Sequence, residues 1–319
     1  MKKPLVFLIA LSLVAATTGM AFAGPKKSFT IGYSQFWGTN PFLIAMTNGA
    51  KKAIEEWRAK GVDVKMIVTN GGDTDTSKQV ADTEDLFSQK VDGLLIFPGD
   101  SILLSEPVKN LYNKNNIPVV VTDIGLQSGK YVSFLITDNY LGGKQLADLV
   151  GKNVAKGSKV VTFQHAPGNM NALTRQAGFE ERAKALGLVV LPAKKLKLSL
   201  EDGKTTMEDT LASDPDIAAV FLINQVVAQG ASSALEAAGN TTCKVVTFDI
   251  DKPSLDLVKN GKILGITVQD PWLIGHDGMN QMLSYLTGGA AKAKIDVPPK
   301  LCTKANASDF DNDPQVTGK

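Results

Sequence analysis

Residues 29–61 read FTIGYSQFWGTNPFLIAMTNGAKKAIEEWRAKG and contain a predicted strand, a connection and a helix. The strand is FTIGYS, and apolar residues then recur at the spacing of one helix face: Leu43, Met46, Ala50, Ile54 and Trp57. Asn40 is suited to cap this helix, Pro41 to begin it and Gly61 to end it. A strand that leads directly into an amphipathic helix is the repeating unit of α/β folds.

The same unit recurs along the chain, where short β-rich runs alternate with amphipathic helices to about Thr287. Runs such as GLLIFP at 93–98 and IPVVVTD at 117–123 are almost entirely apolar, as parallel strands buried on both faces are. After YVSFLITD at 131–138 the alternation begins a second time with KVVTFQ at 159–164. Two successive series of similar size predict an α/β protein with two doubly wound parallel-sheet lobes.

The amino terminus has the pattern of a secretory signal peptide. Lys2 and Lys3 precede an apolar run from Leu5 to about Ala16, and small residues then lead to an expected cleavage site after Ala23. The run is shorter than the about 20 residues of a membrane-spanning helix. Without the two lysines, 34 − 2 = 32 basic residues balance 32 acidic ones, which argues against nucleic acid as a partner. We therefore expect a periplasmic protein.

The chain has two cysteines, Cys243 and Cys302. An oxidising compartment permits a disulfide between them, and two unpaired thiols are equally compatible with the sequence. Their spacing resembles no zinc motif, so we interpret both as structural residues.

Motifs for phosphate binding and hydrolysis are missing from the sequence. GLQSGKY at 125–131 has the wrong spacing for a phosphate-binding loop, and no GxGxxG follows a predicted strand. HExxH and GxSxG are absent, and the two histidines, His165 and His276, leave few candidates for a metal site or a Ser/His triad. We expect neither a metal nor a cofactor.

Nearly every predicted strand ends in a hydrogen-bonding side chain. In doubly wound sheets, ligands bind beyond the carboxyl ends of the strands. Each such side chain is also explained by capping of the helix that follows. The candidates at these positions include Ser34, Gln35, Asp123, His165, Asn224, Asp249 and Gln269.

Several strings, taken in order, resemble those of the periplasmic sugar-binding proteins of ABC importers. The resemblance is to the ribose-binding type, which is related to the ligand domains of lactose-repressor-type regulators. It covers nearly the whole chain after the signal peptide. The strings are NPF at 40–42, IPVVVTD at 117–123, TDNYLGGKQLAD at 137–148, RQAGF at 175–179, PDIAAVFLIN at 215–224, VVTFD at 245–249, NGKILGITVQ at 260–269 and IG at 274–275.

This resemblance implies a periplasmic binding protein fold of type I, with a hinge of three crossings near Thr137, Gln269 and Val297. It implies one lobe of residues 28–137 plus 270–297 and another of residues 138–269 plus 298–319. Closure of the lobes would be a hinge motion.

The resemblance also implies ligand-binding residues from both lobes and the hinge: Ser34, Asn40, Phe42, Asp123, Arg175, Asn224, Asp249 and Gln269. Most of these side chains present two planar polar atoms, which can hold neighbouring sugar hydroxyls. We include Gln35, Phe36, Trp37 and His165 as further candidates. The first connection is longer than in the family pattern, and Ile124 replaces an arginine of the ribose-binding pattern. Both departures argue against ribose itself.

The function implied is that of a monomeric receptor, not an enzyme, which captures a monosaccharide or related polyol and delivers it to the membrane subunits of an ABC importer. Two alternatives stay open. One is a secreted glycosidase or sugar-modifying enzyme that uses Asp123 and Asp249 as paired carboxylates. The other is a receptor that serves a chemoreceptor or a sensor kinase. Trp272 either packs at the hinge or contacts the ligand.

Overall fold

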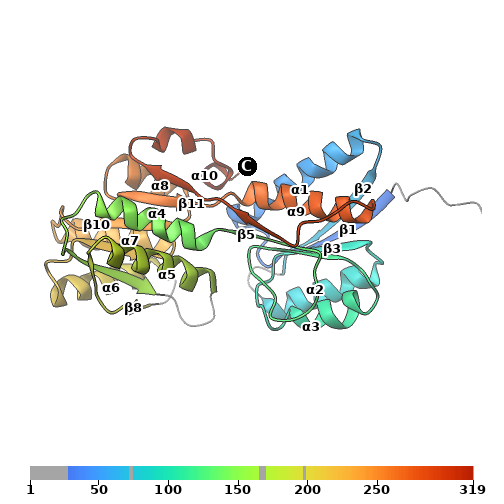
Figure 1. Ribbon diagram of the computed structural model, residues 1–319, viewed down its shortest axis with the longest axis horizontal. Coiled ribbons are helices and arrows are strands. Elements are labelled where there is room, and N and C mark those ends of the chain that lie inside the picture. Colours follow the sequence, from blue (N-terminus) through green and yellow to red (C-terminus); the bar gives the residue numbers. More distant parts are fainter. Residues whose placement is uncertain (1–27, 72–74, 165–169, 197–198, 319) are drawn as a thin grey trace, which may run out of the picture.

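The structure, a computed structural model, describes residues 28–71, 75–164, 170–196 and 199–318. It consists of two lobes that lie side by side along the longest axis of the molecule (Figure 1). The signal peptide expected at residues 1–23 lies outside the described residues. Within the described residues, no helix combines the length and the apolar character that crossing a membrane requires.

The first lobe is built on a sheet of six described strands: β1 (Ser28–Ser34), β2 (Asp63–Thr69), β3 (Gly93–Ile96), β4 (Val119–Thr122), β5 (Ser133–Thr137) and β12 (Lys294–Val297). Their order is β12-β5-β4-β3-β1-β2, and all neighbours are parallel. One face packs against two long helices, α1 (Pro41–Ala59) and α9 (Pro271–Leu286). The other face packs against α2 (Thr76–Ser88), α3 (Ser105–Pro107) and a π-helical segment, Val108–Asn113.

The second lobe is built on a sheet of seven described strands: β6 (Lys159–Gln164), β7 (Val189–Val190), β8 (Lys194–Lys195), β9 (Ala219–Leu222), β10 (Lys244–Phe248), β11 (Gly265–Val268) and β13 (Lys300–Thr303). The order is β13-β11-β10-β9-β6-β7, with β8 also paired to β6, and β13 alone is antiparallel to its neighbour. The strands at the edges, β13, β7 and β8, are short. The buried strands between them are rich in Val, Phe and Leu.

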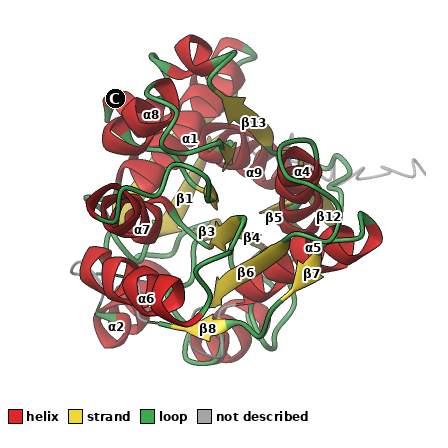
Figure 2. Cartoon of the chain, turned by 90° about the vertical axis from the view of Figure 1, so that its left-hand side faces the viewer, coloured by secondary structure: helices red, strands yellow, loops and turns green. Residues whose placement is uncertain are grey.

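Helices cover both faces of the second sheet (Figure 2). One face packs against α4 (Asn139–Gly151) and α5 (Met170–Ala185). The opposite face packs against α6 (Leu200–Ser213), α7 (Gln225–Ala237) and α8 (Lys252–Lys259). A 3-10 helix, Ala307–Phe310, and α10 (Pro314–Thr317) complete this lobe.

Within the described residues the chain passes between the two lobes three times. It crosses from β5 to α4, from β11 to α9 and from β12 to β13. These segments contain or adjoin Thr137, Gln269 and Val297. The two-lobed α/β fold with a hinge of three crossings is therefore confirmed.

Glycines bring the long helices of each lobe into backbone contact. A Cβ atom on Gly275 of α9 would lie 1.9 Å from the main-chain oxygen of Met46 in α1. A Cβ atom on Gly143 of α4 would lie 2.1 Å from the main-chain oxygen of Arg175 in α5. Side chains larger than hydrogen would force these helices apart, so both glycines fix the spacing of the helices on their sheet.

We expect Gly275→Val to lower the free energy of unfolding by about 1–3 kcal/mol or more, the range that is typical of an overpacked core. The added side chain would meet main-chain atoms of α1, which cannot change rotamer. Urea unfolding measures the change. Ala59→Val, at the exposed end of α1, is the control and should alter stability by only about 0.5 kcal/mol. Equal stability of Gly275→Val and the unaltered protein would contradict the packing described.

The two cysteines are free thiols in the second lobe. Both are buried and belong to the same apolar core. Burial raises the pKa of Cys243 to about 12 and that of Cys302 to about 11. Because the thiolate is the reactive form, both groups should be inert in the folded chain. Of the two states that the sequence left open, the structure has the unpaired one.

Thiol titration should therefore find two reactive groups per chain after denaturation without reductant, and slow reaction before denaturation. A reduced sample, treated in the same way, provides the reference count. If the unreduced, denatured protein showed no reactive thiol, the cysteines would be bridged and the description of this core would be wrong.

Candidate ligand-binding site

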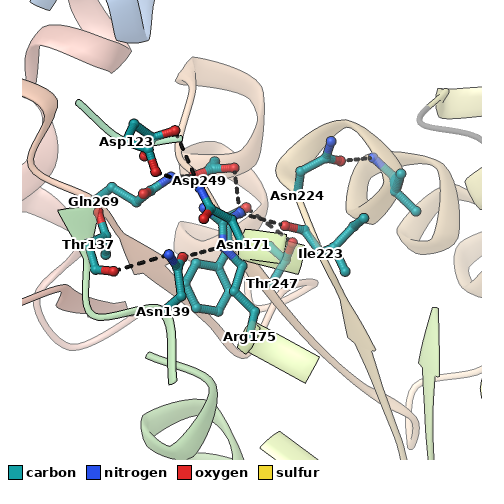
Figure 3. A network of polar contacts seen from close by, with 12 residues as sticks. Asp123, Thr137, Asn139, Asn171, Arg175, Ile223, Asn224, Thr247, Asp249 and Gln269 are labelled. Atoms are coloured by element: carbon teal, nitrogen blue, oxygen red, sulfur yellow. Dashed lines mark hydrogen bonds and ion pairs between the residues drawn. The ribbon is translucent and has the colours of Figure 1, made fainter. Parts of the chain in front are cut away.

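Arg175 of α5 lies at the centre of a polar network (Figure 3). Its Nε donates to Asn139 Oδ1 over 2.8 Å, and its Nη1 donates to the main-chain oxygen of Ile223 over 3.1 Å and to Asp249 Oδ2 over 3.2 Å. The guanidinium carbon lies 4.3 Å from the centre of the Phe248 ring. The side chain is buried, so these contacts hold the guanidinium in one orientation.

Asp123 and Asp249 share an unusual backbone conformation, one in each lobe. Each directly follows a strand, β4 or β10, and their φ angles are 61° and 65°. Residues other than glycine in this left-handed region cost of order 1–3 kcal/mol and cluster at binding sites. The main-chain N–H of Asp123 donates to Leu135 in the neighbouring strand, and that of Asp249 donates to Thr267. These bonds fix the turns that carry the two carboxylates.

Asp123 is buried, and one of its oxygens accepts no hydrogen bond from the described residues. Burial raises the pKa of this carboxyl group from 3.8 to about 6, with Arg175 opposing the rise and Asp249 adding to it. Among the described residues, Asp123 Oδ1 accepts no hydrogen bond, and neither does the buried Oε1 of Gln269. A buried acceptor without a donor costs about 1–3 kcal/mol. The site therefore has two acceptor oxygens suited to the hydroxyl groups of a ligand.

Gln269 links the hinge to this network. Its Nε2 donates to Asp249 Oδ1 over 2.6 Å. Its main-chain oxygen accepts a hydrogen bond of 3.1 Å from Gln315 in α10. At another crossing, Asn139 Nδ2 donates to the main-chain oxygen of Thr137 over 3.1 Å. Two of the described crossings are thus hydrogen-bonded to residues of the site.

One contact joins the site across the two lobes. Asn171 Nδ2, in the first turn of α5, donates to the main-chain oxygen of Asp123 over 3.3 Å and to its Oδ2 over 3.4 Å. Asp123 follows the first sheet, whereas α5 covers the second. The residue that follows β4 in the first lobe therefore meets the first turn of α5 in the second lobe, and Figure 3 shows both side chains.

Ser34 and Gln35, two predicted candidates, are buried inside the first lobe. Ser34 Oγ shares a hydrogen bond of 2.9 Å with Thr83 Oγ1 and also accepts from Gln79 Nε2. Gln35 Nε2 donates to Thr47 Oγ1 over 2.5 Å. In the structure, Ser34 thus holds α2, and Gln35 holds α1, against the end of β1.

The remaining candidates of the first connection lie between β1 and α1. Asn40 caps α1, because its Oδ1 accepts from the N–H of Phe42 over 2.9 Å. The rings of Phe36 and Phe42 are partly buried against the core. Trp37 is 40% exposed, and its Nε1 donates to Thr39 Oγ1. The carboxyl end of the first sheet thus carries three aromatic rings that are not fully buried.

Asn224 caps α7, because its Oδ1 accepts from the N–H of Val227 over 3.1 Å. It directly follows Ile223, whose main-chain oxygen accepts a hydrogen bond from Arg175 (Figure 3). Trp272 stacks on His276, one turn later in α9, with ring centres 5.0 Å apart. His165 lies outside the described residues.

The network unites four residues that the sequence singled out: Asp123, Arg175, Asp249 and Gln269. Sequence reasoning missed Asn139 and Asn171. Asn171 lies four residues before Arg175, a spacing that places both on one helix face. That spacing was the available signal for Asn171.

The raised pKa of Asp123 predicts a pH dependence of stability. Because the folded chain binds this proton more tightly than the unfolded chain, stability falls as pH rises from about 4 to above 6. Asp123→Asn removes the titration. Between pH 4 and pH 7.5, its free energy of unfolding should therefore rise relative to that of the unaltered protein, by at most about 3 kcal/mol. Urea unfolding at both pH values measures this difference. A difference that does not change with pH would contradict the burial of this charge.

Comparison with known proteins agrees with the geometry. The family described as "Periplasmic binding protein domain" matches residues 31–290. The ribose import binding protein of Bacillus subtilis (strain 168) is 33% identical over 313 residues, which cover 95% of this chain and 100% of that protein.

Two solved structures are similar over nearly their whole length. An ABC transporter solute-binding protein from Agrobacterium vitis, bound with alpha-D-tagatopyranose, is 26% identical with a TM-score of 0.76, covering 91% of this chain and 98% of that chain. A carbohydrate transporter solute-binding protein from Agrobacterium radiobacter, in complex with D-arabinose, is 28% identical with a TM-score of 0.72, covering 92% and 98%.

Proposed function

Because the chain belongs to the periplasmic binding protein family, we propose that it captures a monosaccharide or related polyol between its two lobes and delivers it to an ABC importer. The similar proteins support this proposal. They include a ribose import binding protein and transporter solute-binding proteins solved with tagatose and arabinose. We place the protein in the periplasm, after removal of the predicted signal peptide.

The observation that carries the proposal is a pair of buried acceptors, Asp123 Oδ1 and Gln269 Oε1, which accept no hydrogen bond from the described residues and belong to the same network as Arg175. A sugar offers many O–H donors and oxygen acceptors at short spacing. Hydroxyl groups would satisfy the two acceptors, and the guanidinium would donate to a sugar oxygen. The partly exposed rings of Phe36, Trp37 and Phe42 are suited to cover the apolar C–H faces of a sugar.

Ligand binding would favour a closed arrangement of the lobes. Asp123 belongs to the first lobe, whereas Arg175 and Asp249 belong to the second. A ligand that contacts all three gains its full set of hydrogen bonds only when the lobes are together, which biases the hinge toward closure. The importer would then recognise the closed form. A chemoreceptor or sensor kinase could read the same change.

Ile124 supports a ligand other than ribose. It follows Asp123 directly and packs partly against the core of the first lobe. An aliphatic side chain at this position has no hydrogen-bond donor, so the oxygens near Asp123 must be bound by other groups. A monosaccharide whose hydroxyl pattern differs from that of ribose fits this change.

A thermal-shift screen of pentoses, hexoses, ketoses and sugar alcohols should find at least one that stabilises the folded protein. Calorimetry should then give one site per chain, and the recovered ligand should be chemically unchanged. Recovery of a converted sugar would support the enzyme that uses Asp123 and Asp249 instead. If no sugar or polyol binds, the proposed function is wrong.

Asp249→Asn should weaken binding of that ligand about tenfold to a hundredfold, because it removes a charged partner of Arg175. Asp148→Asn is the matched control, since Asp148 forms an exposed pair with Arg182 on the same helix as Arg175. It should bind within about twofold of the unaltered protein. Equal losses in both variants would refute the assignment of Asp249 to the site.

A further inference from the structure

We propose that Asn171 determines ligand specificity, by binding the same ligand hydroxyl group as the carboxylate of Asp123. The inference rests on the proposed function and names one residue that the family resemblance does not supply. It would make the first turn of α5 part of the binding site, together with Arg175 in the next turn.

The position of Asn171 depends on the contacts of Arg175, one turn later in α5. Arg175, on the same helix face, is held by Asn139, Ile223 and Asp249. Gly143 allows α4 to contact the α5 backbone at Arg175 itself. These contacts set the direction of the helix face, so Asn171 lies beside Asp123 as a consequence of packing in the second lobe.

The contact between Asn171 and Asp123 is long and shared. Its two distances, 3.3 Å to the main-chain oxygen and 3.4 Å to Oδ2, exceed the usual 2.7–3.2 Å of N–H···O bonds. The amide therefore lies next to the carboxylate without a strong bond to either acceptor. A ligand oxygen could take the place of these acceptors at little cost.

The chemistry of the two groups is complementary. Asp123 Oδ1, when ionised, can only accept, so it selects the O–H of a hydroxyl group. The oxygen of that hydroxyl then needs a donor, which Asn171 Nδ2 can provide. An ether oxygen lacks the proton for Asp123, and a deoxy carbon lacks both. Together the two side chains would thus recognise a free hydroxyl at one ring position.

The donor also comes from the opposite lobe. Ile124, adjacent to Asp123, offers no donor to the ligand, whereas Asn171 belongs to a helix of the second lobe. The hydroxyl would therefore be bound from both sides only when the lobes are together. Recognition of this hydroxyl would contribute to closure.

The test compares Asn171→Ala with the unaltered protein by calorimetry. The probe is the tightest binder among D-ribose, D-arabinose, D-allose and D-tagatose, with its complete set of monodeoxy analogues. We expect Asn171→Ala to weaken binding of the parent sugar about threefold to tenfold, as loss of a neutral hydrogen bond does. For one monodeoxy analogue, the variant and the unaltered protein should bind equally, because the hydroxyl that Asn171 contacts is gone.

Thr174→Ala is the matched control, because Thr174 is partly exposed on the same helix and its Oγ1 donates to the main-chain oxygen of Met170 within that helix. It should leave all affinities within about twofold. Asn171→Ser, which keeps a donor, should restore part of the lost affinity for the parent sugar. A role of Asn171 in folding alone would weaken every analogue by the same factor, and that result would overturn the inference, as would an unchanged affinity. If the unaltered protein bound none of the probes in this set or in the wider screen, the proposed function itself would fail.

Discussion

A buried guanidinium must be surrounded by acceptors, and Arg175 obtains its acceptors from three separate segments. Asn139 comes from the first crossing, Ile223 from the end of β9 and Asp249 from the end of β10. Removing one partner of a buried charge typically costs about 3–5 kcal/mol. The carboxyl ends of β9 and β10 are therefore hydrogen-bonded to the same guanidinium. Because Arg175 belongs to α5, these bonds also fix the position of α5 on the sheet. The Phe248 ring covers one face of the guanidinium.

The hinge is tied to the same point. Gln269 binds Asp249 through its side chain, and its main-chain oxygen accepts from Gln315, which is buried in the short helix α10. The next residue, Asp270, caps α9 and pairs with Lys300 at the start of β13. A change in the hydrogen bonds of Gln269 thus reaches a crossing directly. For a two-lobed receptor, this is a physical route from ligand contacts to the orientation of the lobes.

Most of the fold could be predicted because its buried strands are apolar runs and its helices have one apolar face. The prediction was less complete where those signals are weak. β12 and β13 are four-residue edge strands, KIDV and KLCT, whose charged residues hide any apolar run. Leu104, Val108 and Leu111 recur at the spacing of a single helix, but the structure has α3 followed by a π-helical segment there.

The expectation that ligands bind beyond the carboxyl ends of the strands located the region of the site. It could not predict where each side chain at a strand end points. Successive side chains of a strand point to opposite faces of the sheet. Ser34 accordingly bonds to Gln79 and Thr83 of α2 on one face, and Gln35 bonds to Thr47 of α1 on the other. Asp123 and Asp249 escape this alternation, because their left-handed backbone turns the chain away from the plane of the sheet. Arg175 and Asn171 follow no strand. Arg175 is placed by packing within the second lobe, whereas Asn171 meets Asp123 across 48 residues of sequence and from the other lobe, so this contact depends on how the two lobes pack.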